Sequence, residues 1–212
     1  GCVDSVTHTI VIATPPVSQF TASNSCINSV VSFTDQTTGN DNYWHWYFGD
    51  GATSFAHNPT HTYTSSGTFN VMLISGDTLG CLDTVSHPIT IFPLPVASAG
   101  TNQNVCAGGS VTLTATGGVT YVWHPSGSTG SSIVLTPGSS TNVSVTVTDA
   151  NGCSAVDTVS IAVNPLPNIN AGTDGFICSG GSVTLNATGG ISYVWMRGGH
   201  SGPSYTVDPA TT

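Results

Sequence analysis

The chain has 212 residues with a formal net charge of −9 at pH 7, because ten are Asp or Glu and only one, Arg197, is Lys or Arg. Without a basic patch it is poorly suited to nucleic acid, whose phosphates are bound by Lys and Arg, or to an anionic membrane surface. No run of 18 apolar residues is present, so we expect no membrane insertion. Thr and Ser alternate with Val, Ile and Leu, which indicates half-buried strands rather than a disordered coil.

Residues 1–16 are predicted to be the last strand of a truncated upstream repeat, with the body of that repeat preceding this sequence. The strand-like run GCVDSVTHTIVI at residues 1–12 is similar to GCLDTVSHPITI at residues 80–91. It ends in Pro15 and Pro16, and paired prolines fix the backbone and interrupt a strand ladder. We therefore expect a short, stiff linker to end this segment.

The most informative run, YWHWYFGDG, covers residues 43–51. Its alternation places Trp44, Trp46 and Phe48 on one face of a predicted strand, which we assign to the core. Tyr43, His45 and Tyr47 fall on the opposite, outward face. We also place Asp50 among the structural core residues, as an Asx-type turn former between two glycines.

Two further motifs follow in order, NPTHTY at residues 58–63 and the alternating run SGTFNVML at residues 66–73. Together the three motifs resemble the PKD domain, an immunoglobulin-like (Ig-like) β-sandwich of extracellular and surface proteins. The resemblance rests on Trp46 with FGDG, on Asn58-Pro59 with His61 and Tyr63, and on Gly67 with Phe69 and Val71. We predict a PKD-like domain at residues 17–94.

The rest of the chain repeats itself. The run AGTNQNVCAGGSVTLTATGGVTYVW at residues 99–123 returns as AGTDGFICSGGSVTLNATGGISYVW at residues 171–195. Such self-similarity is the mark of tandem repeats. We predict an Ig-like repeat at 95–166 and a truncated Ig-like repeat at 167–212, with Trp123 and Trp195 as matching core residues. The predicted fold class is all-β, with tandem Ig-like and PKD β-sandwich domains joined by short Pro-rich linkers.

Six cysteines recur in phase, one early and one late in each repeat, and none forms a CxxC pair typical of zinc or redox sites. We expect an oxidising compartment and disulfides Cys26–Cys81 and Cys106–Cys153, each with a tryptophan between its cysteines as in Ig sandwiches. Cys2 and Cys178 are then left without partners. Free buried thiols remain the alternative.

The sequence contains only weak candidates for a catalytic, metal-binding or sugar-binding site. His57 and His61 have the spacing of helical metal ligands but lie in a predicted loop and strand, and no EF-hand spacing organises the carboxylates. Neither a nucleophile elbow nor an acidic pair on a recognisable scaffold is present. We expect no catalytic residue, no cofactor and no metal site. The oxygen donors weighed for calcium are Asp35, Asp41 and Asp50 with Asn40 and Asn42; Tyr43, His45 and Tyr47 are weighed for stacking on sugar rings.

A short motif, Asp-(Ser/Thr)-apolar, occurs four times and resembles the O-glycosylation signal of Bacteroidetes surface proteins. The resemblance implies acceptors at Ser5, Thr78, Thr84 and Thr158. Ordinary strand composition in a Thr-rich chain is the alternative.

Taken with CAGGSVTLTATGG, TYVW, VSVTVTDANGC and VNPLP, the repeats resemble those of giant Bacteroidetes adhesins, including gliding-motility adhesins exported by type IX secretion. The resemblance implies a non-catalytic extracellular stalk or filament at the cell surface. Its partners would be adjacent repeats of the same protein, and surface polysaccharide or neighbouring copies in a filament. Two alternatives stay open: an accessory, glycan-binding region of a secreted hydrolase, and a filament in which residues 1–12 complete the open repeat of another copy.

Overall fold

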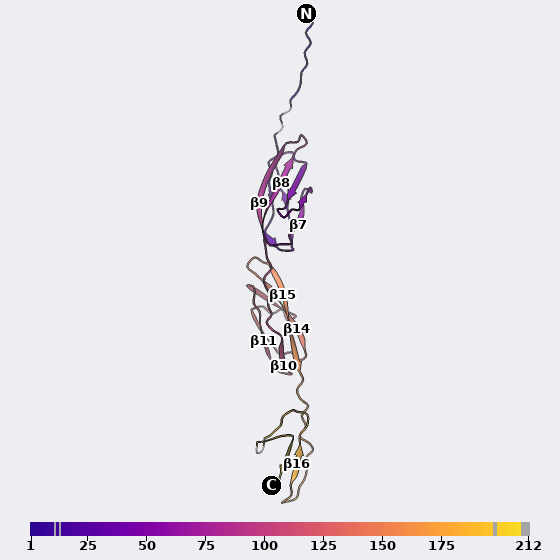
Figure 1. The fold of residues 1–212 in the computed structure, drawn as a ribbon, viewed down its shortest axis with the longest axis vertical. Coiled ribbons are helices and arrows are strands. Elements are labelled where there is room, and N and C mark those ends of the chain that lie inside the picture. Colours follow the sequence, from indigo (N-terminus) through magenta and orange to yellow (C-terminus); the bar gives the residue numbers. More distant parts are fainter. Residues whose placement is uncertain (11, 13, 197–198, 209–212) are drawn as a thin grey trace. The chain divides into compact units, whose positions relative to one another are not determined.

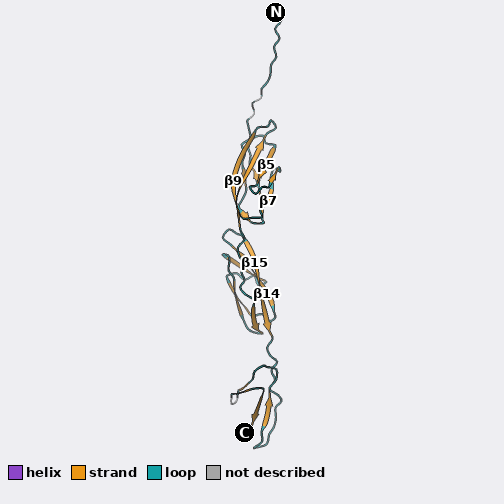
Figure 2. Ribbon diagram, viewed as in Figure 1, coloured by secondary structure: helices purple, strands orange, loops and turns teal. Residues whose placement is uncertain are grey.

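The computed structural model describes residues 1–10, 12, 14–196 and 199–208, so Arg197 lies outside the described residues. Figure 2 shows strands and loops throughout these residues, and no helix. This confirms the predicted all-β class. Among the described residues there is consequently no helix of the length and hydrophobicity needed to cross a bilayer.

By its internal contacts the chain divides into two units, each described separately. The first comprises Gly1–Thr101, Thr112–Ile133 and Val143–Val159, and the second comprises Asn102–Val111, Val134–Asn142 and Ser160–Thr212.

Nine strands lie between residues 17 and 94, within the first unit. Five of them form one sheet in the order β2-β9-β8-β5-β6, in which β2 pairs with β9 in parallel and the other pairs are antiparallel. Two separate pairs, β1 with β4 and β3 with β7, complete the segment. The strands are β1 (Phe20–Thr21), β2 (Ser25–Cys26), β3 (Val30–Ser32), β4 (Thr34–Asp35), β5 (Tyr43–Tyr47), β6 (Thr53–Ser54), β7 (Thr60–Thr62), β8 (Gly67–Gly76) and β9 (Leu82–Phe92).

The long hairpin of β8 and β9 is the frame of this segment, and Figure 1 shows the two strands side by side. Their register is continuous from Gly67 opposite Ile91 to Gly76 opposite Leu82. Alternate residues of both strands face the core, as the period of two requires. The hairpin therefore turns Val71, Leu73, Ile89 and Ile91 into the core.

The core of residues 17–94 is built around Trp46, which is fully buried and donates its indole N–H to the carbonyl oxygen of Ala56 at 2.9 Å. Phe48 is buried beside it, and fully burying such side chains contributes about 2–3 kcal/mol each. Asp50 forms the expected Asx-type turn, because its carboxylate accepts from the Ala52 amide at 3.0 Å. This turn faces solvent, so the place of Asp50 among the predicted core residues is corrected. The other buried residues of this core are Phe20, Val31, Phe33, Tyr63, Val71, Leu73, Ile89 and Ile91.

Six strands follow between residues 95 and 166. Four form a sheet in the order β10-β15-β14-β12, and β11 pairs with β13. Trp123 on β12 is fully buried and stands opposite Val145 on β14. The strands are β10 (Gln103–Cys106), β11 (Val111–Thr114), β12 (Thr120–His124), β13 (Ser132–Leu135), β14 (Thr141–Thr148) and β15 (Ser154–Asn164).

The last segment repeats part of this arrangement. Antiparallel β16 (Val183–Asn186) and β19 (Ser204–Val207) form one pair, and β17 (Val194–Trp195) and β18 (His200–Ser201) form another. Trp195 is only half-buried, which corrects its prediction as a core residue. The physical reason is that no counterpart of β14, the strand opposite Trp123, is present in the described part of residues 167–208.

The described residues of 1–16 form no strand, contrary to the prediction. Their apolar side chains are exposed: Val3 at 94%, Val6 at 82%, Ile10 at 86% and Ile12 at 90%. A strand is held by its ladder, and no neighbouring strand of the described chain pairs with this run. The alternation of the sequence is therefore not sufficient to make it a strand here.

Candidate functional site

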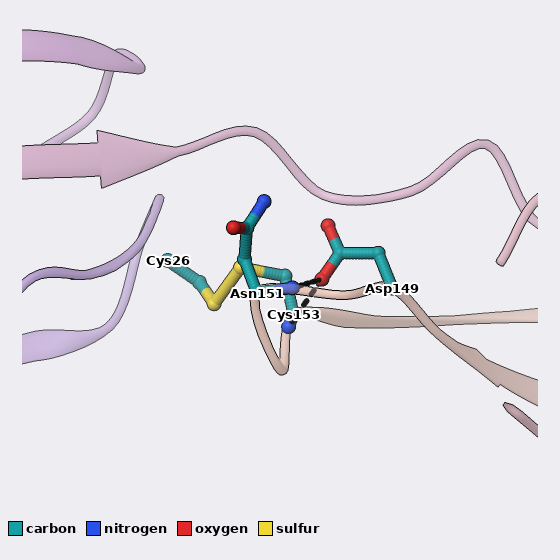
Figure 3. The surroundings of a disulfide bond; sticks show 4 residues. All are labelled: Cys26, Asp149, Asn151 and Cys153. Carbon is teal, nitrogen blue, oxygen red and sulfur yellow. Dashed lines mark hydrogen bonds between the residues drawn. A yellow bond between two sulfur atoms is a disulfide. The ribbon is translucent and has the colours of Figure 1, made fainter. Parts of the chain in front are cut away.

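A disulfide joins Cys26 of segment 17–94 to Cys153 of segment 95–166, with their Cα atoms 5.6 Å apart although the two residues are 127 positions apart in sequence (Figure 3). Both cysteines belong to the first unit. Cys153 is buried and Cys26 is half-buried. The bond thus links residues 17–94 to residues 95–166, and lies within neither of these two segments.

Cys153 is held by a hairpin turn between β14 and β15. One carboxylate oxygen of Asp149 accepts hydrogen bonds from the backbone amides of Asn151 at 2.8 Å and Cys153 at 2.9 Å, as Figure 3 shows. The Asp149 amide donates to the Cys153 carbonyl at 2.9 Å, which closes the turn. Gly152 has a φ of 82°, a conformation that L side chains rarely adopt. The sequence DANGC therefore fixes the position from which the sulfur of Cys153 projects.

Cys26 does not follow a hairpin turn but lies beside the end of the long strand β9. It is the last residue of β2 and pairs in parallel with Phe92, the last residue of β9. The next amide, that of Ile27, donates to the Phe92 carbonyl at 2.9 Å, and the Ser29 amide turns back to the Cys26 carbonyl at 3.1 Å. The sulfur is therefore presented where the segment 17–94 ends.

The expected pairs Cys26–Cys81 and Cys106–Cys153 are wrong, and strand length explains why. Cys81 precedes β9, whereas Cys26 lies beside its last residue, so the eleven residues of β9 separate them by about 36 Å. A disulfide requires Cα atoms within about 7 Å. Cys106 likewise pairs with Asn164 at the far end of β15, which begins after Cys153. The free thiols are Cys2, Cys81, Cys106 and Cys178.

The aspartates of two Asp-(Ser/Thr)-apolar motifs have a structural role. Asp83 accepts a hydrogen bond from the Ser18 amide at 2.7 Å, and Asp157 accepts one from the Ala99 amide at 2.8 Å. These bonds hold the pKa of both carboxyl groups below its ordinary value. The proposed acceptor hydroxyls of the four motifs are exposed, and their modification stays a prediction: Ser5, Thr78, Thr84 and Thr158.

An aromatic surface on β5 and β6 gathers the three outward-facing residues of the sequence motif with a fourth, Phe55. The ring of His45 lies 4.1 Å from that of Phe55 and 4.3 Å from that of Tyr47, and Tyr43 lies 6.3 Å from Phe55. Phe55 was missed because it stands alone in its own run. Continuing the β5–β6 register of Trp46 opposite Ser54 by one residue would have placed it across from His45.

The two histidines weighed as metal ligands have different partners. His61 Nε2 lies 2.7 Å from a carboxylate oxygen of Asp50, and His57 Nε2 lies 3.1 Å from one of Asp35. Burial raises the pKa of Asp50, but the hydrogen bonds from His61 and the Ala52 amide outweigh it and hold that pKa below its ordinary value. Asp50 is paired with His61, and it is not part of the cluster that contains the other two aspartates weighed for calcium.

Asp35, Asp41 and His57 do come together, with one possible ligand atom from each within 4.8 Å of the others. The indole N–H of Trp44 points between the two carboxylates, at 3.0 Å from Asp35 and 2.9 Å from Asp41. Burial raises the pKa of Asp35, whereas hydrogen bonds from Thr37 and Trp44 lower it, with a net decrease. These bonds account for the cluster as a structural network that fixes the half-buried Trp44 ring.

Comparison with known proteins supports the predicted PKD domain in the first large segment. The family model described as the PKD domain matches residues 13–91. The PKD1 domain of Epp from Vibrio anguillarum is 24% identical, with a TM-score of 0.35 and coverage of 38% of this chain and 96% of that one. The PKD1 domain of the metalloprotease PrtV from Vibrio cholerae is 29% identical, with a TM-score of 0.35 and coverage of 37% and 99%.

Over a longer stretch, the chain is similar to the fibronectin(III)-like modules of CbhA from Clostridium thermocellum. That similarity covers 70% of this chain and 95% of that one, at 12% identity and a TM-score of 0.38. No curated protein matches the chain. The family model therefore supports a PKD domain at residues 13–91.

Proposed function

We propose that this protein is a non-catalytic, extracellular structural and adhesive module, a segment of a long cell-surface stalk or filament. The observation that carries the proposal is the bond between Cys26 and Cys153, which ties one repeat to the next. Disulfides persist in oxidising compartments, which favours a location outside the cytoplasm. An accessory domain that only holds a catalytic domain in place has less need of such a link.

The bond has a direct mechanical consequence. A pull applied beyond both cysteines passes from Cys26 through the sulfur–sulfur bond to Cys153. The stretch closed by the bond, whose end residues are 127 positions apart, is thereby shielded, and it contains both buried tryptophans, Trp46 and Trp123. Most core residues of both segments are thus protected by one covalent link, as a stalk under tension requires, whereas Phe20, Val159 and Ile161 lie outside the closed stretch.

Stretching single molecules attached at residues 1 and 212 tests this proposal. In the oxidised protein, the shielded residues contribute no extension at forces that unfold β-sandwiches. After reduction, the contour length grows by up to about 440 Å, at about 3.5 Å per residue over the shielded stretch. The C26S/C153S double variant should match the reduced protein without reductant, and C106S should match the oxidised protein. Full extension of the oxidised protein would refute the shielded load path.

Location and modification need material from the native host. We expect protease added to intact cells to remove the protein, and an intact mass above the sequence mass to reveal glycans at Ser5, Thr78, Thr84 or Thr158. A mass equal to the sequence mass would exclude glycosylation, and it would weaken the proposal that this is a Bacteroidetes protein exported by type IX secretion. A protein protected from added protease would exclude the surface location.

Carbohydrate binding is the second candidate function, and the aromatic surface of Tyr43, His45, Tyr47 and Phe55 favours it. Phe55 is 62% exposed and Tyr43 is 39% exposed, so their rings are open to a flat ligand. Pull-down with insoluble cellulose, chitin and xylan tests it. Binding that is lost in F55A and kept in F69A, an inward-facing control of the same segment, would support it. Absence of binding to all three would remove polysaccharide as the partner of this surface and leave the stalk proposal intact.

A further inference from the structure

Cys81 and Cys106 have the same local structures as the two bonded cysteines: Cys81 follows a hairpin turn as Cys153 does, and Cys106 lies beside a strand end as Cys26 does. We infer that both form disulfides between successive repeats, and we call such residues junction cysteines. Cys106 bonds the hairpin cysteine of a complete repeat that follows it, and Cys81 bonds the early cysteine of a repeat that precedes it. The structure contains one finished example of this junction, Cys26–Cys153. The inference concerns the chemistry between repeats and holds whether the array is a stalk or an accessory region.

The first argument is the identity of the two hairpin turns. Asp77 holds the turn before Cys81 as Asp149 holds the turn before Cys153. Its carboxylate accepts from the amides of Leu79 and Cys81, both at 2.9 Å, and its own amide donates to the Cys81 carbonyl at 3.1 Å. The glycine before each cysteine also matches, with φ of 86° at Gly80 and 82° at Gly152. Cys81 is therefore presented as Cys153 is.

The second argument is the identity of the two strand ends. Cys106 pairs in parallel with Asn164, the last residue of β15, as Cys26 pairs with Phe92 at the end of β9. The amide of Ala107 donates to the Asn164 carbonyl at 2.8 Å, and the amide of Gly109 turns back to the Cys106 carbonyl at 2.9 Å. Cys106 is exposed, so a partner can reach it.

The third argument is the connection to the next repeat. Pro93-Leu94-Pro95 follows β9, and the same three residues, Pro165-Leu166-Pro167, follow β15. Beyond each linker, the sequences from Ala99 and from Ala171 match without a gap. Phe92 pairs with Cys26, and Asn164 pairs with Cys106. In a complete repeat after residue 166, the hairpin cysteine would therefore lie as many positions after Asn164 as Cys153 lies after Phe92.

Bond formation needs an oxidant, and a small-molecule disulfide such as glutathione disulfide suffices. A thiolate attacks one sulfur of the oxidant and releases one glutathione thiol. The second cysteine thiolate then attacks the mixed disulfide and releases the other. Two cysteine thiols lose two protons and two electrons in total, and one glutathione disulfide gains them as two thiols.

An extended chain tests the inference, with a second copy of residues 95–166 in place of residues 167–212. After refolding in a glutathione buffer, peptic peptides are mapped by mass spectrometry without reduction. We expect Cys26–Cys153 and a second bond between Cys106 and the hairpin cysteine of the copy. Overturning results are a hairpin cysteine bonded to the early cysteine of its own copy, or Cys106 left as a thiol while Cys26–Cys153 forms.

Matched variants separate misfolding from a wrong inference. C106S should leave the hairpin cysteine of the copy alkylatable and Cys26–Cys153 intact, whereas serine at the early cysteine of the copy should change neither bond. In the 212-residue chain itself, we expect Cys26–Cys153 with Cys81 and Cys106 both alkylatable. A bond of Cys106 to Cys81 or Cys178 within one molecule of that chain would overturn the inference even if the extended chain does not fold.

Discussion

The carboxylate of Asp157 accepts a hydrogen bond from the backbone amide of Ala99 at 2.8 Å, which fastens the start of the segment 95–166 to its last strand, β15. Asp83 and the Ser18 amide repeat the arrangement in the segment 17–94. In each segment the aspartate lies on the final long strand and the amide lies just after the preceding linker. The same contact thus joins the first and last parts of each of the two segments.

This contact predicts a pH dependence of stability. The Ala99 amide lowers the pKa of Asp157 in the folded protein, so its stabilisation is complete above the unfolded value, about 3.9, and is lost as pH falls through the folded value. D157N retains an acceptor oxygen but does not titrate. We expect D157N to be less stable than the native chain by about 1 kcal/mol at neutral pH, with the difference vanishing in acid.

Urea denaturation followed by tryptophan fluorescence from neutral pH to pH 3 measures this difference. D4N, which removes the same charge from an exposed residue, is the control. An equal loss of stability in D4N and D157N would assign the effect to net charge instead of to the contact.

Tyr63 predicts an effect at the opposite end of the pH scale. Its hydroxyl donates to the Phe48 carbonyl at 3.0 Å, and burial, followed by the charge of Asp50, raises its pKa to about 12. Because the folded value is raised, the stabilisation is complete below the unfolded pKa of about 10 and is lost as pH rises towards 12. We expect Y63F to cost about 1–2 kcal/mol at neutral pH, since the buried carbonyl loses its donor.

The difference between Y63F and the native chain should shrink above pH 10, because only the native chain must keep this buried phenol neutral. Urea titrations at several alkaline pH values give the comparison, and the other tyrosines contribute equally to both proteins. A difference that stays constant with pH would contradict the assigned role of Tyr63.

Cys81 predicts a difference in thiol reactivity. Burial, followed by the neighbouring Asp77 carboxylate, raises the pKa of the Cys81 thiol, so its thiolate fraction at neutral pH is low. In D77N the amide oxygen can still accept from the turn amides, but the negative charge is gone. We expect faster alkylation of Cys81 by iodoacetamide in D77N, with the rate at Cys106 unchanged as an internal reference. Equal rates at Cys81 in both proteins would show that Asp77 does not control the thiol.

The Cys26–Cys153 bond predicts a large change in thermal stability. Chain-entropy arguments for a loop of this length give up to about 5 kcal/mol. We expect C26S/C153S to unfold at a lower temperature by calorimetry, with the two segments melting separately. C106S, which removes only a free thiol, should melt as the native chain does. A double variant with the native melting profile would show that the bond joins segments that are already stable without it.

The fold class could be predicted from sequence because it depends on local signals. The alternation around Trp46 and along residues 66–73 places each side chain on one face of a strand, and the glycine turns end those strands. The run at residues 1–12 has the same alternation and forms no strand, because a ladder depends on a partner that local sequence does not contain. Trp195 is half-buried for the same reason.

The order Cys-Trp-Cys predicts the wrong cysteine pairs because the order of residues along the chain does not establish contact between them. In an Ig disulfide the cysteines lie within facing strands. Here Cys26 and Cys106 are the last residues of short strands, whereas Cys81 and Cys153 follow a glycine turn and precede a strand. That position was visible in the sequence and would have argued against pairs within a repeat. The partner in the next repeat could be identified only from the folded chain.

The eleven-residue strand β9, which separates Cys26 from Cys81, has a consequence for how the protein is made. A chain that leaves its exporter or ribosome from the N-terminus completes residues 17–94 well before Cys153 emerges. Once that segment has folded, β9 prevents its two cysteines from forming a premature local crosslink. Cys26 therefore stays available as a thiol until the hairpin that carries Cys153 has formed. Oxidation of this pair then follows the folding of both segments in chain order.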